Sequence, residues 1–532
     1  MSSGRNDVVI LGGGLNSLVA ACVLAKAGRR PLLLERRDEV GGTASTSTLA
    51  PGFKVPTLMH GLGPLRPTLV AELGLEKHGL TLLESETLLT TFDGDGRALV
   101  IARDPRRAAE AIGAFSADDA TRYIEFDAAV GRIAGALAPL LDTLPPDIDK
   151  PRLGELASLF GTARRIKGLG KRDLIRLLRF MPMAAADLAA EWFETEALRA
   201  AVAARAILGQ SAGPWSAGTG AVYFMRAAAD PHALGTLVTP RGGPGALAAA
   251  LAASARAAGA VIRTGADVVR LETRDGAVAT VVLASGDRID APVVVSGLDP
   301  KRTLLALLQP DDLGPEFRRR VRNIRSRGVT AKVNLALDRL PSFGALKDRG
   351  TAAAAALSGR IIVGHEIDAL ERAYDASKYG RTSEAPFIEA TIPSLLDPSL
   401  APDGKHVLSA LVQFVPYHAA EGDIALDRDA VGDRVVQSLA RHAPDLPGLV
   451  TARQVLTPRD LEADWGLTEG HLFQGEEALD QFFTMRPILG WARHKTPVRG
   501  LYLCGAGTHP GGGLTGANGR NAARAVLAEP KG

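Results

Sequence analysis

The sequence predicts an α/β fold, because the order of short apolar strand, glycine-rich turn and helix occurs near both ends of the chain. Near the start, residues 7–11 read as a strand, 17–27 as a helix and 31–35 as a second strand. They form a β-α-β unit of about 30 residues, the size typical of a mononucleotide-binding half. Near the end, residues 500–527 repeat the same order. We therefore expect a Rossmann-like domain to which both ends of the chain contribute.

Composition allows a large core and excludes some classes of partner. The chain has 532 residues, 46% of them hydrophobic, which is enough for more than one domain. The 62 basic residues nearly balance the 59 acidic ones and only 5% of residues are aromatic, so nucleic acid is not an expected partner. The two cysteines, Cys22 and Cys504, form no CxxC pair, which argues against a redox dithiol and a cysteine metal site. We expect no metal.

The sequence also bears on location. No basic segment followed by an apolar stretch and a cleavage site precedes the first strand, so we expect no signal peptide. No apolar run reaches the roughly 20 residues that a membrane span needs. The low cysteine content fits a reducing compartment. These observations predict a cytoplasmic protein.

The first glycine-rich turn, GGGLNS, lies between the first strand and the first helix. Gly12 permits a tight turn, Gly14 lets the backbone approach a pyrophosphate, and the small Ser17 takes the place of the third glycine. Glu35 ends the second strand, where a carboxylate can accept both ribose hydroxyls. This combination predicts dinucleotide binding. Asn16, in the same turn, and Arg36, next to Glu35, are further expected contacts.

A second glycine pair separates FAD from the nicotinamide dinucleotides. The carboxylate of Glu35 disfavours the 2′-phosphate of NADP but allows both NAD and FAD. Val40, Gly41, Gly42 and Thr43 follow it, and a glycine pair there lets more backbone pass close to the pyrophosphate and ribityl chain. An NAD dehydrogenase does not need this second approach. The turn therefore favours FAD binding over a purely structural role. The sequence contains no second dinucleotide-binding motif, so we do not expect a separate NAD(P) domain.

The tail supplies the third glycine-rich turn. LCGAG follows an apolar strand and HPGGGLTG precedes a helix. The N-terminus of a helix suits the partial negative charge of a reduced flavin ring. A second structural glycine turn is the alternative, and the presence of three such turns favours the flavin.

At this point the sequence resembles the phytoene desaturase-like branch of the FAD-dependent amine oxidase and carotenoid desaturase superfamily. The stretches that carry the resemblance cover nearly the whole chain: GGGLNSLVAA with LLLERRDEVGGTAST, PRGGPGALAAAL with GADVVRL, IPSLLDPSLAPDGKH, and GHLFQGEEALDQFFTMRP with GLYLCGAGTHPGGGLTGANGRNAA. The resemblance implies an amine oxidase-type FAD domain in three pieces, 1–70, 236–300 and 490–532. A substrate domain is inserted, with a helical part, 71–235, and a mixed sheet and helix part, 301–489.

The resemblance also assigns roles to single residues. It implies that Gly12, Gly14 and Ser17 contact the pyrophosphate, Glu35 the adenosine ribose and Gly42 the pyrophosphate and ribityl stretch. The remaining contacts that it implies are Val268 at the adenine, and Gly505, Leu514, Thr515 and Gly516 at the ribityl chain and ring. Thr43 and Ala44 stand where many relatives carry Gly-Gly-Arg-Ala, so an arginine contact is missing. No cysteine or histidine fits a pattern typical of covalent attachment, so we expect non-covalent FAD.

The pattern changes along the rest of the chain. Residues 104–229 are helical in pattern, whereas 261–296 contain short strands separated by hairpin signals. A further set of strands is expected at 329–337, 387–392 and 406–415.

His509 is the best-placed titratable residue for catalysis, because its loop lies between the tail strand and the flavin-facing turn. A hydrogen-bonding spacer is the alternative role for this histidine. Five residues of the inserted regions are candidates for the pocket wall or for ordinary packing: Tyr223, Arg226, Tyr417, His418 and His471.

The expected activity is FAD-dependent removal of hydride from a C–H bond of a largely apolar small molecule, forming a C=C or C=N bond. Oxygen, a quinone or another carrier would accept the electrons. A redox-neutral flavin isomerase or saturase, an amine oxidase and a non-catalytic flavin-bound scaffold remain as alternatives.

The segment 164–180 is dense in arginine and lysine, with leucine, isoleucine and phenylalanine among them. One interpretation is a solvated helix packed on the substrate domain. The other is a peripheral contact with the inner face of a membrane, through which a lipophilic substrate would enter.

Overall fold

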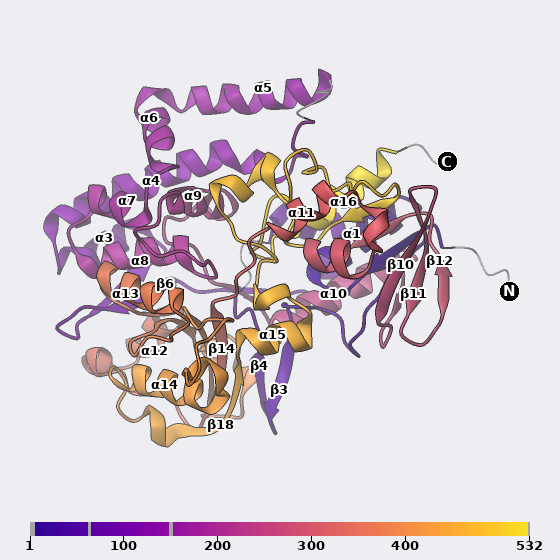
Figure 1. Cartoon of the computed structure of the whole chain (residues 1–532). Helices are drawn as coiled ribbons and strands as arrows, with labels where there is room; N and C mark the ends of the chain where they lie inside the picture. Colours follow the sequence, from indigo (N-terminus) through magenta and orange to yellow (C-terminus); the bar gives the residue numbers. More distant parts are fainter. Residues whose placement is uncertain (1–5, 62–64, 148–152, 530–532) are drawn as a thin grey trace.

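The computed structural model describes residues 6–61, 65–147 and 153–529. A five-stranded parallel sheet lies at the centre of the part that holds both ends of the chain, on the right in Figure 1. The order of its strands is β19 (Leu501–Leu503), β13 (Val294–Ser296), β1 (Val8–Leu11), β2 (Pro31–Leu34) and β9 (Val261–Arg263). All four pairings are parallel, which confirms the predicted α/β, Rossmann-like class.

Both faces of this sheet are covered, as a parallel sheet requires. Val8, Ile10 and Leu33 pack against one group of helices, whereas Val9 and Leu11 face the other side. The helices are α1 (Leu15–Lys26), α10 (Pro244–Ala257) and α16 (Ala517–Leu527). The other face packs on an antiparallel meander of β10 (Val268–Arg274), β11 (Ala277–Leu283) and β12 (Arg288–Asp290).

The stretch 261–296 differs from the chain of hairpins that its turn signals predict. β10, β11 and β12 do form antiparallel hairpins. β9 and β13, however, pair in parallel with β2 and β1 in the main sheet. Turn residues report local reversals, and they carry no information about the distant strand with which a segment pairs.

A second sheet of seven strands lies in the lower part of Figure 1. The order of its strands is β18 (Val450–Leu456), β14 (Thr330–Leu337), β17 (His406–Gln413), β16 (Phe387–Thr391), β15 (Arg360–Val363), β6 (Thr87–Phe92) and β7 (Ala98–Ala102). β6 and β7 belong to the stretch 71–235, which is predicted from the sequence to be helical. β6 pairs with β15 and β7 pairs with β6, so the two inserted stretches share one sheet.

Helices cover one side of this sheet and form the largest apolar core. They are α3 (Pro105–Gly113), α4 (Ala117–Leu141), α5 (Leu153–Gly168), α6 (Gly170–Phe180), α7 (Ala185–Trp192), α8 (Glu196–Ile207) and α9 (Thr219–Ala229). In Figure 1 α5 lies at the outer edge of this layer. No helix in the described ranges is long and apolar enough to cross a membrane.

Shorter elements complete the fold. Two-stranded sheets pair β3 (Thr46–Ala50) with β4 (Phe53–Pro56) and β5 (Leu82–Glu84) with β8 (Val238–Pro240). The remaining α-helices are α2 (Pro67–Leu73), α11 (Pro315–Arg322), α12 (Ala352–Leu357), α13 (Ile367–Lys378), α14 (Arg428–Ala440) and α15 (Pro458–Trp465).

Candidate functional site

A cleft lies where the turn between β1 and α1 meets the loop after β2 and the tail loop before α16. Trp465 at the end of α15, and Leu467, Leu472, Phe473 and Gln474 after it, close the cleft on a further side. Nine of the residues expected to bind the cofactor line this cleft: Gly12, Gly14, Asn16, Ser17, Glu35, Gly42, Thr43, Gly505 and Leu514. Segments from both ends of the chain thus form one wall.

The turn between β1 and α1 has the geometry of an anion-binding site. Gly12 has φ +82°, a conformation that favours glycine. Gly14 is the N-cap of α1, and in the described structure no side chain caps that helix end. The amide groups of its first turn therefore point toward the cleft without a side-chain partner, which suits a phosphate. A methyl group on Gly14 would meet no atom within 4 Å, so space is open beside it.

The glycine pair after β2 brings a second stretch of backbone to the same place. The Gly41 amide donates to the Gly13 carbonyl at 2.8 Å. Gly42 has φ +58°, and a methyl group there would lie 3.1 Å from the Cα atom of Gly14. Larger residues would separate the two turns.

Ser17 lies where related turns carry a third glycine, and Gly297 at the end of β13 makes room for it. A Cβ atom on Gly297 would overlap the Ser17 Oγ atom. Ser17 Oγ also lies 3.8 Å from the buried Cys504 Sγ. Close helix-strand contact is kept because the glycine stands on the strand side.

Glu35 is buried and held at two points. Its Oε2 accepts the Gly13 amide at 2.5 Å and its Oε1 accepts the Arg37 amide at 2.8 Å. Each carboxylate oxygen can accept a further hydrogen bond. The carboxylate is therefore oriented before any ligand arrives.

The tail turn ends at α16. Gly516 is its N-cap with φ +74°, and again the described residues provide no side-chain cap. Leu514 has φ +59°, which is uncommon for a residue with a side chain. The backbone of this turn thus has positive φ angles at Leu514 and Gly516, beside the cleft.

Five expected cofactor contacts do not line this cleft. Gly41 supports the turn from behind and Gly516 caps α16, while Thr515 lines a neighbouring cavity. Val268 opens β10, close to Ala266, whose amide donates to the Glu35 carbonyl at 2.8 Å.

Arg36 differs most from its expected role. Its guanidinium donates to the carbonyls of Ala463 and Asp464 at 3.2 and 2.5 Å, at the C-terminal end of α15. A cation stabilises that end of a helix. Arg36 therefore joins two parts of the fold.

The sequence matches a family model described as flavin containing amine oxidoreductase over residues 18–527. The chain belongs to this family. FAD is the cofactor, as the glycine-rich turns predict.

Relatives and a solved structure are similar to the chain along nearly its whole length. Pyridine nucleotide-disulfide oxidoreductase domain-containing protein 2 of Rattus norvegicus is 35% identical, covering 99% of this chain and 94% of its own. A limonene dehydrogenase polypeptide of Castellaniella defragrans is 28% identical, covering 98% and 94%. A redesigned putrescine oxidase shares the fold, with a TM-score of 0.60, 17% identity, and coverage of 98% and 99%.

The residues of the cleft in this flavoprotein fit FAD. Within the described structure, the Asn16 Oδ1 atom is buried without a hydrogen-bond partner. A ligand group that donates a hydrogen bond would satisfy it. The described lining contains no cysteine, histidine or tyrosine that could attach to the flavin covalently, in agreement with non-covalent FAD.

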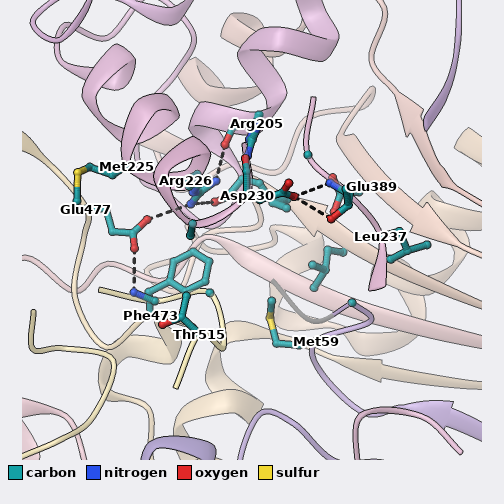
Figure 2. Close-up of a pocket in the computed structure, with 18 of the residues that line it drawn as sticks. Met59, Arg205, Met225, Arg226, Asp230, Leu237, Glu389, Phe473, Glu477 and Thr515 are labelled. Atoms are coloured by element: carbon teal, nitrogen blue, oxygen red, sulfur yellow. Dashed lines mark hydrogen bonds and ion pairs between the residues drawn. The ribbon is translucent and has the colours of Figure 1, made fainter. Parts of the chain in front are cut away.

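Figure 2 shows the wall of a second cavity, which shares lining residues with the cofactor cleft. Met59, Phe473, Gly512 and Gly513 line both spaces. The wall of the second cavity is largely apolar, with Met59, Leu141, Leu208, Met225, Leu237, Leu411, Phe473 and Phe482. A molecule in this cavity would lie next to the cofactor across a shared boundary.

Ion pairs fix one side of the cavity (Figure 2). Arg226 of α9 donates to Glu477 Oε2 at 3.2 Å, and Glu477 Oε1 accepts the Gly512 amide at 2.9 Å. Arg226 also donates to the carbonyls of Arg205 and Leu208 at 2.6 and 2.7 Å. Glu477 thereby links the helical layer to the tail loop at the shared boundary.

A buried histidine lies on the opposite part of the wall, near the seven-stranded sheet. His60 Nε2 lies 3.2 Å from Glu389 Oε1 on β16, and His60 Nδ1 lies 3.3 Å from Lys332 Nζ on β14. Arg360 on β15 contacts Glu389 Oε2 at 3.4 Å. Sequence reasoning missed all four residues, because no motif connects them and three separate strands bring them together.

His509, the expected catalytic candidate, is not among the described residues that line either cavity. Its Nε2 lies 2.7 Å from the Leu140 carbonyl and its ring contacts Phe483. Burial lowers the pKa of His509 to about 3, so it is neutral at pH 7. The structure favours the spacer role that the sequence left open.

Of the five pocket candidates, Arg226 lines the cavity. Tyr223 donates to the Ala233 carbonyl and packs in the helical core. Tyr417 bonds to Glu462, and His418 is exposed on the surface. His471 is buried and accepts the Phe473 amide through Nδ1 at 3.2 Å.

Proposed function

We propose that this flavoprotein is a dehydrogenase that removes hydride from a C–H bond of a largely apolar small molecule. The observation that carries the proposal is the boundary of Met59, Phe473, Gly512 and Gly513, which the apolar cavity shares with the cofactor cleft. The similarity to a limonene dehydrogenase polypeptide supports an apolar substrate. Oxygen or a quinone would accept the electrons afterwards.

The chain's own residues would position the substrate and exclude water. Phe473, Phe482 and the leucines bury apolar surface of the ligand, which favours its binding. Glu477 holds the tail loop through the Gly512 amide, so the boundary keeps its shape. FAD, when bound, supplies the two-electron oxidation.

An amine oxidase is the second candidate, because putrescine oxidase shares the fold. The carboxylates of the cavity wall are already engaged. Arg360 contacts Glu389, Arg226 contacts Glu477, and the Thr236 amide and hydroxyl donate to Asp230. An ammonium ion would compete with these partners, which makes a polar amine the poorer fit.

Anaerobic reduction of the bound flavin tests the proposal. We expect limonene and related apolar alkenes to bleach the visible absorption band of the oxidised holoprotein, and putrescine to leave it unchanged. Bleaching by putrescine alone would favour the amine oxidase. Conversion of an alkene only after chemical reduction of the flavin would favour an isomerase or saturase. A flavin that none of these compounds reduces or requires would favour a non-catalytic scaffold.

We further propose that α5 and α6 touch an anionic membrane surface. Three large apolar side chains are exposed there: Phe160 at 70%, Leu178 at 66% and Ile175 at 45%. Exposed basic residues surround them, namely Arg164, Arg165, Lys167, Lys171, Arg172 and Arg179. On the inner face of α6, Leu177 and Phe180 pack into the helical core. The exposed face combines the apolar and cationic groups of an interfacial helix.

A further inference from the structure

Arg486 is a buried arginine that lies behind the wall of the cofactor cleft. It is 2% exposed. Its guanidinium donates to six backbone carbonyls at distances between 2.8 and 3.3 Å, namely those of Phe473, Gly475, Glu476, Gln481, Ala506 and Thr508. Arginine is rarely buried to this extent, so a cation that is bonded in this way needs an explanation.

The six carbonyls belong to two segments that form different sides of the cleft. Phe473 lines the cleft in the segment after α15, and Ala506 lines it in the tail turn. The Nη2 atom of Arg486 donates to both carbonyls, at 3.0 and 2.8 Å. Gln474 links the same two segments, because its Oε1 accepts the Gly507 amide at 3.2 Å. Arg486 therefore holds these two sides of the cleft together from behind.

The guanidinium also brings a positive charge that its hydrogen-bond partners do not cancel. The acceptors described for it are neutral carbonyls. Burial lowers the pKa of Arg486 to about 10, and Glu477 acts in the opposite direction, so the side chain stays protonated at pH 7. Glu477 is shared with Arg226, which contacts its Oε2 at 3.2 Å (Figure 2). Two arginines and one glutamate thus leave one formal positive charge beside the tail loop.

We propose that Arg486 is a positioning residue for FAD, which holds the segment 473–475 against the tail turn and places a positive charge behind the cofactor cleft. A hydride brings two electrons and one proton, so the flavin ring gains one negative charge on reduction. A fixed cation in a buried wall stabilises such a charge more than it would in water. Arg486 therefore makes the reduction potential of the flavin less negative. This inference concerns the cofactor and does not depend on the substrate.

The two parts of the proposal separate in two variants. A guanidinium presents five N–H donors in one plane, whereas a lysine ammonium has three donors on one atom. Arg486→Lys should therefore keep the charge and lose most of the contacts with the two segments. Arg486→Met should lose both.

The affinity for FAD measures the link between the two segments. We expect the dissociation constant, obtained from the fluorescence of released FAD, to rise at least about tenfold in both variants, because the two sides of the cleft are no longer held together. Arg325→Met is the matched control. Arg325 is 45% exposed, and it contacts the carboxylates of Glu476 and Asp480 in the same segment. If the Arg486 variants bind FAD as tightly as this control, the link is wrong.

The reduction potential of the bound flavin measures the effect of the charge and needs no substrate. Slow chemical reduction in the presence of a redox dye reports this potential at pH 7. We expect a potential more negative than that of the wild type in Arg486→Met, and a nearly unchanged potential in Arg486→Lys. A purely structural role would change both variants alike, so equal potentials in the two variants would overturn the electrostatic role.

Glu477→Gln changes the charge and leaves the arginine in place. The variant removes the carboxylate and keeps an oxygen that can accept the Gly512 amide. Its flavin potential should become less negative, opposite to the shift in Arg486→Met. If Arg486→Met does not fold, Arg486→Lys still reports the link and Glu477→Gln still reports the charge. An unchanged or more negative potential in Glu477→Gln would overturn the electrostatic role.

Discussion

At the scale of single residues, the Glu35 carboxylate is held in position in the cleft before the cofactor binds. Its carboxylate accepts the amides of Gly13 and Arg37. We expect Glu35→Gln to weaken FAD binding about 10- to 100-fold, because a charged acceptor is lost from a buried site. Fluorescence of released FAD measures the affinity. Glu39→Gln, on an exposed neighbour, is the control, and equal affinity of the two variants would contradict the role of Glu35.

Ser17 and Gly297 are complementary in size where α1 contacts the strand side of the turn. A Cβ atom on Gly297 would overlap the Ser17 hydroxyl. We expect Gly297→Ala to destabilise the holoprotein by about 1–3 kcal/mol, because overpacking displaces α1. Adding Ser17→Gly should restore most of that loss. Urea unfolding of the wild type, the two single variants and the double variant measures the coupling energy between the two positions. Additive changes in the free energy of unfolding would show that the two residues do not compensate for each other in size.

This pair also shows what the sequence could reveal at this scale. The turn GGGLNS and Glu35 are local, so their spacing predicts where they lie. The glycine that accommodates Ser17 directly follows β13, and parallel pairing of β13 with β1 brings it there. A single sequence does not report such a pairing.

At the scale of elements, α5 and α6 present an apolar and basic face that the rest of the fold does not cover. We expect the protein to bind vesicles containing phosphatidylglycerol, and Phe160→Glu with Leu178→Glu to reduce binding at least about tenfold, because each change removes an apolar contact and adds repulsion. Vesicle co-sedimentation measures this. The control is Tyr379→Glu, which alters another strongly exposed ring.

Two results would contradict this contact. Equal binding by wild type and the double variant would exclude α5 and α6 as the contact. Binding that does not weaken with added salt would argue against attraction of the basic residues to anionic lipid.

The second sheet explains why the cofactor cleft was predicted in large part and the adjoining apolar cavity was not. β6 comes from a stretch read as helical and pairs with β15, far along the chain. Glu389, on the next strand, faces His60 because of that assembly. Isolated acidic and basic residues within apolar strands carry no motif, so no pattern in the chain connects them before it folds.

At the scale of the whole molecule, buried histidines make stability depend on pH. Burial lowers the pKa of His60 and His494 to about 4, and that of His471 and His509 to about 3. Unfolded histidine titrates near pH 6.5, so between about pH 6.5 and 4 the unfolded chain binds more protons than the folded one. Stability should therefore fall as the pH drops through this window.

Thermal unfolding of the holoprotein between pH 8 and 4.5 measures this effect. We expect Tm to be nearly constant above pH 7 and to fall progressively below pH 6.5. In His509→Gln the fall of Tm with pH should be less steep, because one histidine with a lowered pKa is removed. A Tm that stays level to pH 4.5 would mean that these rings are not held neutral.

The position of β19 and α16 has a consequence for biosynthesis. β1 and α1 leave the ribosome long before β19 pairs with β13 and α16 packs on α1. Until then the nascent chain lacks Gly505 and Leu514, and with them one side of the cleft. We therefore expect the complete flavin cleft to form only after the tail segment has been synthesised and has paired with β13.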